Sequence, residues 1–427
     1  MVDWIRWSRL TFNQSGEHPA GDFSESFRLY PFPSPLYLCE KQRRGKLQLN
    51  NFWVYRRILF SKRFISSLGR SRQNILLERY GLPPSTGPYM AELDVTYRCD
   101  CRCQMCQRWQ GRQSGEMTLE EYARLSEDFL RMGVHLVSIA GGEPLLREDI
   151  FAIIKVFTRY GMAVNLCTNG LSLERYTGEL SRSGASCITV SIDGATARTH
   201  EKIRGVADSY EKIEKGILSL LAHPLQERPV VRVRMTICGQ NVEGVGSFYR
   251  KWRGVADDVL LQPVHRCRKA FYIGEDEELF HFDPELIVRQ LEGTPLQKKG
   301  GYMDKFLLSL REGGTFPRHR CYAGVLMVRL DPWGNVYPCL EQHACVGSVK
   351  RDDFLKIWQA EVFNNVRNSI SREGNCRCWY NNTALISHYA ALLGRMSARQ
   401  IVQAARKVLE TKAFHRVAPS ENQSFWP

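Results

Sequence analysis

Short β-rich runs alternate with longer helical stretches between residues 91 and 264, and this alternation constrains the fold more than any other feature. The β-rich runs are 91–96, 135–140, 163–167, 186–192, 230–237 and 259–264. Strands separated by helices at this spacing form βαβ units, whose strands pair in parallel. Six units in about 175 residues are too few for a closed eight-unit barrel of roughly 250 residues. The sequence therefore predicts an α/β fold with an open, partial (β/α)6 barrel.

The stretches between these runs carry helix start and stop signals. Thr118 with Glu121 three residues later forms a capping box ahead of apolar residues at helical spacing, and Gly133 supplies a stop. We therefore expect a helix between these positions. Further helices are expected over 149–160, 171–183 and most of 195–222.

The chain divides into four parts. Its 427 residues are enough for two or three domains. We expect a basic, mainly helical extension at 1–87, the barrel at 88–265, a linker and cysteine-bearing region with a β-hairpin at 266–380, and a basic helical tail at 381–427. Residues 265–300 show no regular pattern, whereas Ser397 and Gln400 form a second capping box in the tail.

The excess of basic residues lies at the two ends. The net charge is +14, and residues 1–90 hold 14 Lys and Arg against 6 Asp and Glu, while 381–427 hold 6 against 2. Residues 51–65 interleave aromatic and basic side chains. This pattern fits a helix that covers the barrel with a solvated basic face, and it also fits contact with an anionic membrane surface. Nucleic acid ranks last, because no nucleic-acid motif accompanies the charge.

Whether the 14 cysteines form disulfides or bind metal depends on the compartment of the protein. The N-terminus lacks the basic-then-apolar order of a signal peptide, and no run of 18 apolar residues occurs. We therefore expect a cytoplasmic protein, peripheral to a membrane if its basic ends bind lipid. Thiols persist in that reducing compartment, so clustered cysteines indicate metal rather than disulfides.

Three cysteines follow the first predicted strand in a C-x3-C-x2-C spacing, at Cys99, Cys103 and Cys106. Three thiolates from one short loop can each bind one iron of a cubane cluster, which leaves the fourth iron open to a substrate. The alternative is a zinc knuckle that uses Cys101 as its fourth ligand, because structural zinc takes four closed ligands.

Polar and glycine-rich motifs end the next three predicted strands. They are Gly141-Gly142-Glu143-Pro144, Thr168-Asn169-Gly170 and Ser191-Ile192-Asp193-Gly194. Each could be a simple turn, but the carboxyl ends of barrel strands are where such folds build their sites. Glycines at 141 and 142 would let the backbone approach a ligand, and Glu143 would supply a carboxylate for an ammonium group.

Together, the cysteine triad, the three strand-end motifs and the His200 to Gly205 segment resemble the radical S-adenosylmethionine (SAM) superfamily over about residues 88–265. The resemblance implies a [4Fe–4S] cluster on the triad, with SAM chelating the open iron through its amino and carboxylate groups. It places Gly142 and Glu143 at the methionine amino group, and Ser191, Asp193 or Arg204 at its carboxylate or ribose. Met105 departs from the family, which often has an aromatic residue there, near adenine. We expect Met105 to pack adequately, since it is soft and unbranched.

The resemblance also implies one-electron chemistry. Reductive cleavage of SAM would give a 5'-deoxyadenosyl radical that removes a hydrogen atom from the substrate, with flavodoxin or ferredoxin as electron donor. Cys167, Cys187 and Cys238 lie in or beside predicted strands, where a free cysteine is usually a small buried hydrophobe. Cys238 has the further interpretation of a thiol that returns a hydrogen atom to the substrate.

A second cysteine group follows the barrel, at Cys321, Cys339, Cys376 and Cys378. The turn signal from Asp331 to Gly334 predicts a β-hairpin that carries Cys321 and Cys339 on its two arms. This region resembles the auxiliary-cluster region called SPASM, or its shorter "twitch" form. It lacks the C-x2-C pair of the full form, so we expect one auxiliary [4Fe–4S] cluster. Cys345 is a weaker candidate ligand, and a four-cysteine zinc ribbon is the alternative.

Two classes of function remain open from the sequence. One is a radical SAM enzyme that acts on a peptide or on a small metabolite, sugar or lipid, and the other is a structural or regulatory protein with zinc on both cysteine groups. Peptides are common substrates of auxiliary-cluster enzymes, which is a family analogy. No motif in 265–320 identifies a substrate.

Overall fold

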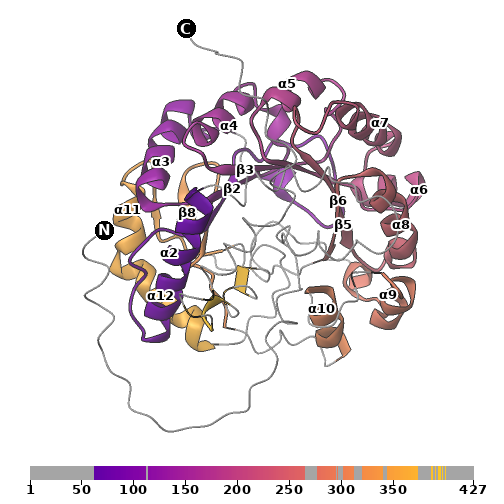
Figure 1. Ribbon diagram of the computed structural model, residues 1–427. Coiled ribbons are helices and arrows are strands. Elements are labelled where there is room, and N and C mark those ends of the chain that lie inside the picture. Colours follow the sequence, from indigo (N-terminus) through magenta and orange to yellow (C-terminus); the bar gives the residue numbers. More distant parts are fainter. Residues whose placement is uncertain are drawn as a thin grey trace.

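The computed structural model describes residues 62–111, 114–264, 277–294, 296, 302–311, 320–339, 344–373 and a few positions between 386 and 400. Its strands form one sheet in the order β6-β5-β4-β3-β2-β1-β7-β8-β9. The first six strands are parallel and curve around a central space, with helices α3 to α8 forming an outer ring (Figure 1). This arrangement confirms the predicted partial barrel.

The barrel elements lie close to their predicted positions. The strands are β1 (Met90–Asp94), β2 (Leu136–Ala140), β3 (Ala163–Thr168), β4 (Cys187–Ser191), β5 (Val230–Ile237) and β6 (Asp258–Pro263). The helices are α3 (Leu119–Met132), α4 (Ile150–Thr158), α5 (Thr177–Arg182), α6 (Ala197–Arg204), α7 (Ser209–Leu221) and α8 (Val245–Val255). Helix α5 is shorter than the expected 171–183, because turns occupy the residues before it.

Helix α3 shows how local sequence sets these boundaries. Thr118 accepts from the Glu121 backbone N–H while the Glu121 side chain accepts from the Thr118 N–H, so the predicted capping box is present. Gly133 ends the helix with φ 79°, a left-handed conformation that favours glycine. The face between these ends buries Leu125 and Phe129 in the core outside the sheet.

Side chains alternate across the strands, so one face of the sheet is an apolar core and the other lines the barrel interior. On β5, Val231, Val233 and Met235 are fully buried in the core between sheet and helices. The intervening Arg232, Arg234 and Thr236 lie on the opposite face. The interior is therefore polar along this strand.

The C-terminal region joins the barrel sheet directly. Strands β7 (Met327–Leu330) and β8 (Asn335–Tyr337) form the predicted hairpin, and the Asp331 carboxylate accepts from the backbone N–H groups of Trp333 and Asn335 in its turn. Strand β9 (Gly347–Ser348) continues it. The sequence did not predict that β7 would pair in parallel with β1.

Helices outside the ring complete the structure. Helices α11 (Phe354–Gln359) and α12 (Glu361–Glu373) follow β9, and Phe354 packs edge-on against Phe129 of α3. Helix α2 (Lys62–Arg79) begins the described chain, and its Arg63 donates to the carbonyl oxygens of Val134 and Tyr160.

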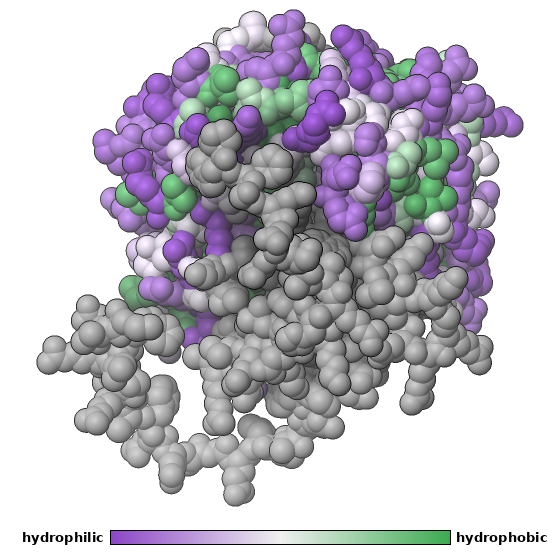
Figure 2. Space-filling view, turned by 45° about the horizontal axis from the view of Figure 1, so that its top comes forward, coloured by the Kyte–Doolittle hydropathy of each residue, from purple (hydrophilic) through white to green (hydrophobic). Residues whose placement is uncertain are grey.

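Two expectations about flanking segments have different outcomes. The prediction that 265–300 lacks regular structure is wrong in part, because helix α9 (Pro284–Gln290) lies in this range, with Asp283 as its cap. Helix α10 (Tyr302–Arg311) follows. The capping box between Ser397 and Gln400 is present. Residues 51–61 and most of the tail lie outside the described residues. Of the helices described, none is long and apolar enough to cross a membrane, and the part of the surface coloured in Figure 2 is mainly hydrophilic, with scattered hydrophobic residues.

Candidate active site

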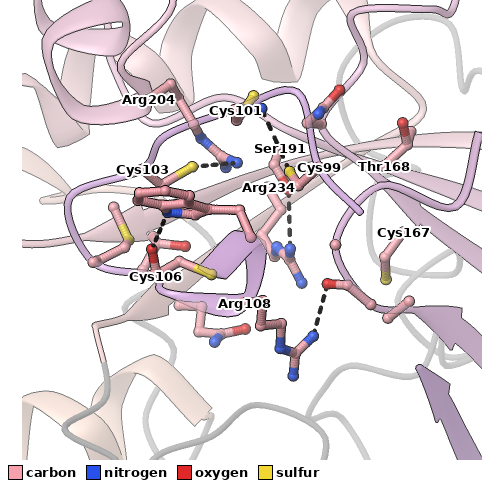
Figure 3. A pocket seen from close by; sticks show the side chains of 18 of the residues that line it. Cys99, Cys101, Cys103, Cys106, Arg108, Cys167, Thr168, Ser191, Arg204 and Arg234 are labelled. Carbon is pink, nitrogen blue, oxygen red and sulfur yellow. Dashed lines mark hydrogen bonds between the residues drawn. The ribbon is translucent and has the colours of Figure 1, made fainter. Parts of the chain in front are cut away.

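The carboxyl ends of the barrel strands surround a cavity that is partly open to solvent. Its lining combines the cysteine loop after β1 with side chains of β1 to β6 (Figure 3). Predicted site residues that line it are Cys99, Cys103, Cys106, Gly141, Gly142, Thr168, Asn169, Ser191 and Arg204. Glu143, Pro144, Asp193 and Cys238 do not line it.

Backbone contacts with α6 hold the cysteine loop in place. The N–H groups of Arg102 and Gln104 donate to the carbonyl oxygens of Arg204 and Ile203, at 3.0 Å each. Gly205 ends α6 with φ 67°, and a Cβ there would meet the Arg102 carbonyl at 2.7 Å. A residue with a side chain at position 205 would therefore push the end of α6 away from the cysteine loop.

The four thiols of the loop have different electrostatic settings. A hydrogen bond with the Cys101 thiol, helped by Arg204, lowers the pKa of Cys103 to about 7 despite burial. The same thiol lowers the pKa of Cys99, whereas its own pKa is raised by its two sulfur neighbours. Burial raises the pKa of Cys106 to about 11. The pKa of Cys101 thus shifts in the opposite direction to those of Cys99 and Cys103, whereas the pKa of Cys106 is raised like that of Cys101.

Sulfur spacing tests which metal the loop fits. A tetrahedral zinc ion, with bonds of about 2.3 Å to sulfur, needs its ligand atoms about 4 Å apart. Within the described part of the chain, the one group of three ligand atoms within 4.8 Å of one another is Cys99, Asp100 and Cys101, and it includes neither Cys103 nor Cys106. The three triad sulfurs are therefore not gathered as ligands of one zinc ion would be, and a cubane does not require this, because each thiolate binds a separate iron.

The glycines after β2 line the cavity and also allow close packing of the chain, so their predicted approach to a ligand stays a prediction. A Cβ at Gly141 would overlap the Thr96 carbonyl oxygen, and one at Gly142 would overlap that of Arg98. Both carbonyls belong to the segment that leads into the cysteine loop. Glycine lets this segment lie directly against the end of β2, as the N–H of Gly142 confirms by donating to Thr96 at 2.7 Å.

Glu143 is fully buried, and its predicted contact with an ammonium group stays a prediction. Its carboxylate accepts from the Leu145 N–H, the Thr168 hydroxyl and the Asn169 N–H, at 3.0, 2.8 and 2.6 Å. Burial raises its pKa to about 7 in spite of these donors. Pro144 begins a 3-10 turn behind it. Glu143 therefore fixes the ends of β2 and β3 relative to each other, and Asn169 in turn donates to Asp100 of the loop.

Asp193 acts behind the cavity, whereas Ser191 and Arg204 line it. The Asp193 carboxylate is fully buried, accepts from the Thr236 N–H at 2.7 Å and forms an ion pair with Arg204 at 2.7 Å. Arg204 in turn lies 3.7 Å from the Cys103 sulfur. Asp193 thus aims a cation at the cysteine loop without reaching the cavity itself.

Met105 and Cys238 belong to one small apolar cluster, with Ile203 and Leu279. Met105 is 6% exposed and lines the cavity, so it is packed as expected. Cys238 is 0% exposed and packs within this cluster, away from the cavity lining. This position favours packing over the interpretation as a hydrogen donor.

Two of the cysteines predicted to hold an auxiliary cluster lie at the base of the β7–β8 hairpin. Cys321 precedes β7 and Cys339 follows β8, and the Gly324 N–H donates to the Pro338 carbonyl at 3.1 Å between the two arms. Cys345 is exposed and donates to the Gly347 carbonyl. Cys376 and Cys378 lie outside the described residues.

Several lining residues were missed from the sequence. They are Glu92, Arg108, Trp109, Arg234, Thr236 and Gln262. A signal exists for some of them, because polar residues recur with period two in otherwise apolar strands, as Glu92 and Asp94 do in β1. Arg108 joins the loop to the barrel: it pairs with Asp94 at 3.0 Å and donates to the Gly141 carbonyl at 2.8 Å.

Known proteins resemble this chain in both regions. Residues 93–251 match the radical SAM superfamily, and residues 321–379 match SPASM, an iron–sulfur cluster-binding domain. The AdoMet-dependent heme synthase of Methanosarcina barkeri is 26% identical over 314 residues, covering 68% of this chain and 88% of that protein. The mycofactocin maturase MftC of Mycobacterium tuberculosis is 25% identical over 301 residues, covering 66% and 73%.

Solved structures agree on the fold. Streptococcus suis SuiB, in a crystal structure bound to the precursor peptide SuiA, superposes with a TM-score of 0.55 at 15% identity over 69% of this chain and 70% of SuiB. Radical SAM enzymes use a [4Fe–4S] cluster and SAM, and the SPASM domain carries auxiliary iron–sulfur clusters. The cysteine loop, the parallel partial barrel and the hairpin with its two cysteines are the parts that such a protein needs, and this chain is a radical SAM superfamily enzyme with a C-terminal SPASM domain.

Proposed function

We propose that this enzyme holds its SAM-binding cluster on Cys99, Cys103 and Cys106 and abstracts a hydrogen atom from a peptide. When bound, the cluster and SAM supply one-electron chemistry that ends in a 5'-deoxyadenosyl radical. The observation that carries the proposal is the convergence of the triad, Ser191 and Arg204 on one cavity at the carboxyl ends of the strands.

The protein's own residues position and protect this chemistry. Arg204, held by Asp193, places positive charge beside Cys103, which favours the thiolate form needed for iron. Thr168, Asn169 and Ser191 supply polar groups along one rim for the methionine and ribose parts of SAM. Met105 supplies an apolar surface for adenine. The surrounding barrel limits the access of water to the reacting atoms.

Two of the compared proteins support a peptide substrate. MftC is named as a maturase, and SuiB was crystallised with a precursor peptide. The second candidate is a step of haem synthesis, because the alignment with the heme synthase covers 88% of that protein. Flavodoxin or ferredoxin is the proposed electron donor. Contact of the basic ends with anionic lipid remains a prediction on residues outside those described.

Cleavage of SAM tests the ligand assignment. Anaerobically reconstituted protein with dithionite should convert SAM to 5'-deoxyadenosine, slowly without substrate, as followed by chromatography. Replacing all three of Cys99, Cys103 and Cys106 by alanine should abolish this product. Cys101→Ala is the matched control, since it removes a thiol from the same loop and should leave the product. An active triple variant with an inactive Cys101→Ala would overturn the assignment.

Substrate class is tested by offering both candidates to the same preparation. Faster formation of 5'-deoxyadenosine with a short peptide encoded beside this protein's gene would support the peptide. Acceleration by a carboxylated tetrapyrrole alone would favour haem synthesis and contradict the peptide proposal.

A further inference from the structure

The cavity has a second wall, formed by β5 and β6, that the residues proposed for SAM do not use. Arg234, Thr236 and Gln262 line this wall. Thr236 and Gln262 are register partners on the two strands, so their side chains lie side by side on the interior face. Figure 3 shows Arg234 extending into the cavity, between Cys106 on one side and Cys167 on the other.

Arg234 differs from the arginines Arg204 and Arg232 in having no carboxylate partner within the part of the chain that the structure describes. Arg232, two residues earlier on the same face, pairs with Asp258 at 2.7 Å, and Arg204 pairs with Asp193 at 2.7 Å. Arg234 donates from Nη2 to the Ser191 hydroxyl at 2.9 Å, its buried Nε has no hydrogen-bond partner, and it forms no ion pair with any described residue. Among the described residues, Arg108, Arg204 and Arg232 each have a carboxylate partner and Arg234 has none.

A partly buried guanidinium without a counter-ion is costly, because its charge has lost water and gained no partner. The planar guanidinium group can donate two parallel hydrogen bonds to the two oxygens of one carboxylate. The Gln262 amide and the Thr236 hydroxyl, for which the described chain provides no side-chain hydrogen bond, add two donors on the same wall. The wall therefore has the charge and the donors of a carboxylate site.

We propose that Arg234, with Thr236 and Gln262, binds a carboxylate group of the substrate. This inference rests on the proposed function, since it assigns one wall of that same cavity to the substrate. The SAM molecule also has a carboxylate, and Arg234 donates to Ser191, which is proposed to contact SAM. The titration of SAM below therefore separates a carboxylate of the substrate from that of SAM.

The test measures binding to the full-length, cluster-loaded protein without turnover. Glutarate is the probe and glutaramide its neutral counterpart, each titrated anaerobically by calorimetry, and SAM is titrated separately. Wild type should bind glutarate more tightly than glutaramide. Arg234→Gln should weaken glutarate at least tenfold, as expected for a lost charge-assisted hydrogen bond. Arg234→Lys should weaken glutarate binding less, because lysine keeps the positive charge and loses only the paired hydrogen bonds of the guanidinium group.

Arg232→Gln is the matched control, since it removes a neighbouring cation that already has a carboxylate partner. It should leave glutarate affinity within twofold of wild type. The proposal fails if wild type does not distinguish glutarate from glutaramide, or if Arg232→Gln weakens glutarate as much as Arg234→Gln. It also fails if Arg234→Gln weakens SAM tenfold, because the carboxylate would then be that of SAM. None of these readouts needs SAM cleavage, so they remain readable if the proposed function fails.

Discussion

Replacing Asp94 by asparagine should destabilise the protein more than any change to a surface charge. Asp94 is 1% exposed and its carboxylate binds both Arg108 and Arg329, with Arg329 Nε at 3.0 Å. Removing one partner of a buried pair leaves an uncompensated charge, at a cost of about 3–5 kcal/mol. Here two buried cations lose their anion, so we expect the upper part of that range.

The assay is urea unfolding of the reconstituted protein, followed by circular dichroism. With an m-value of about 3 kcal/mol/M, a loss of about 4–5 kcal/mol should lower the midpoint by about 1.3–1.7 M. Glu174→Gln is the control, because Glu174 pairs with Lys215 at an exposed site and should shift stability by less than about 0.5 kcal/mol.

Lowering the pH should remove the greater stability of wild type relative to Asp94→Asn. Burial alone would raise the pKa of Asp94, but the two guanidinium groups outweigh it and hold the pKa below its usual range. A depressed pKa contributes stability above the unfolded value of about 4, and that stability is lost as the pH falls through the folded pKa. This account would be refuted if Asp94→Asn lowered the free energy of unfolding by less than about 1 kcal/mol at pH 7. It would also be refuted if the difference in stability between wild type and this variant grew on acidification.

Four further predictions follow from the site. The raised pKa of Glu143 means that the folded state binds the proton more tightly, so wild type should lose up to about 3 kcal/mol of stability between pH 4.5 and 7, and urea unfolding of Glu143→Gln should show a flatter pH profile. Gly142→Ala should displace the loop and lower the iron content measured by colorimetry, whereas Gly254→Ala, with no atom within 4 Å of its added Cβ, should not. Iron analysis should give about eight atoms per chain in wild type and about four without the triad; one tightly bound zinc and no iron in that variant would contradict an auxiliary cluster. Binding to acidic vesicles should weaken with salt and after deletion of residues 1–80, and equal pelleting with neutral vesicles would exclude an electrostatic role for the ends.

Strand periodicity was the most informative part of the sequence for the fold. The predicted 230–237 is β5, and the other barrel strands differ from prediction by at most two residues at either end. Such runs are fixed by short-range alternation of apolar residues, which sequence displays directly. The pairing of β7 with β1 was not predictable, because it joins segments more than 230 residues apart and has no local signal.

The sequence identified many residues of the site but did not show what each of them contacts. Gly141 and Glu143 were found, but their neighbours were unknown: the carbonyl of Thr96 in one case and the donors from Leu145 and the β3 end in the other. A motif shows which residue types recur and does not show which side of the chain they face. Arg234 was overlooked for the opposite reason, since it lies inside a strand rather than in a motif after one.

The position of β7 sets an order for folding during synthesis. Strand β1 is completed early, yet one of its edges has no partner until residues 327–330 leave the ribosome, and the buried Asp94 carboxylate has to wait equally long for Arg329. An unpaired edge of this kind is a template for pairing with other chains. The nascent barrel is therefore vulnerable to aggregation over most of its translation, and a fragment that ends after β6 would keep that vulnerability permanently.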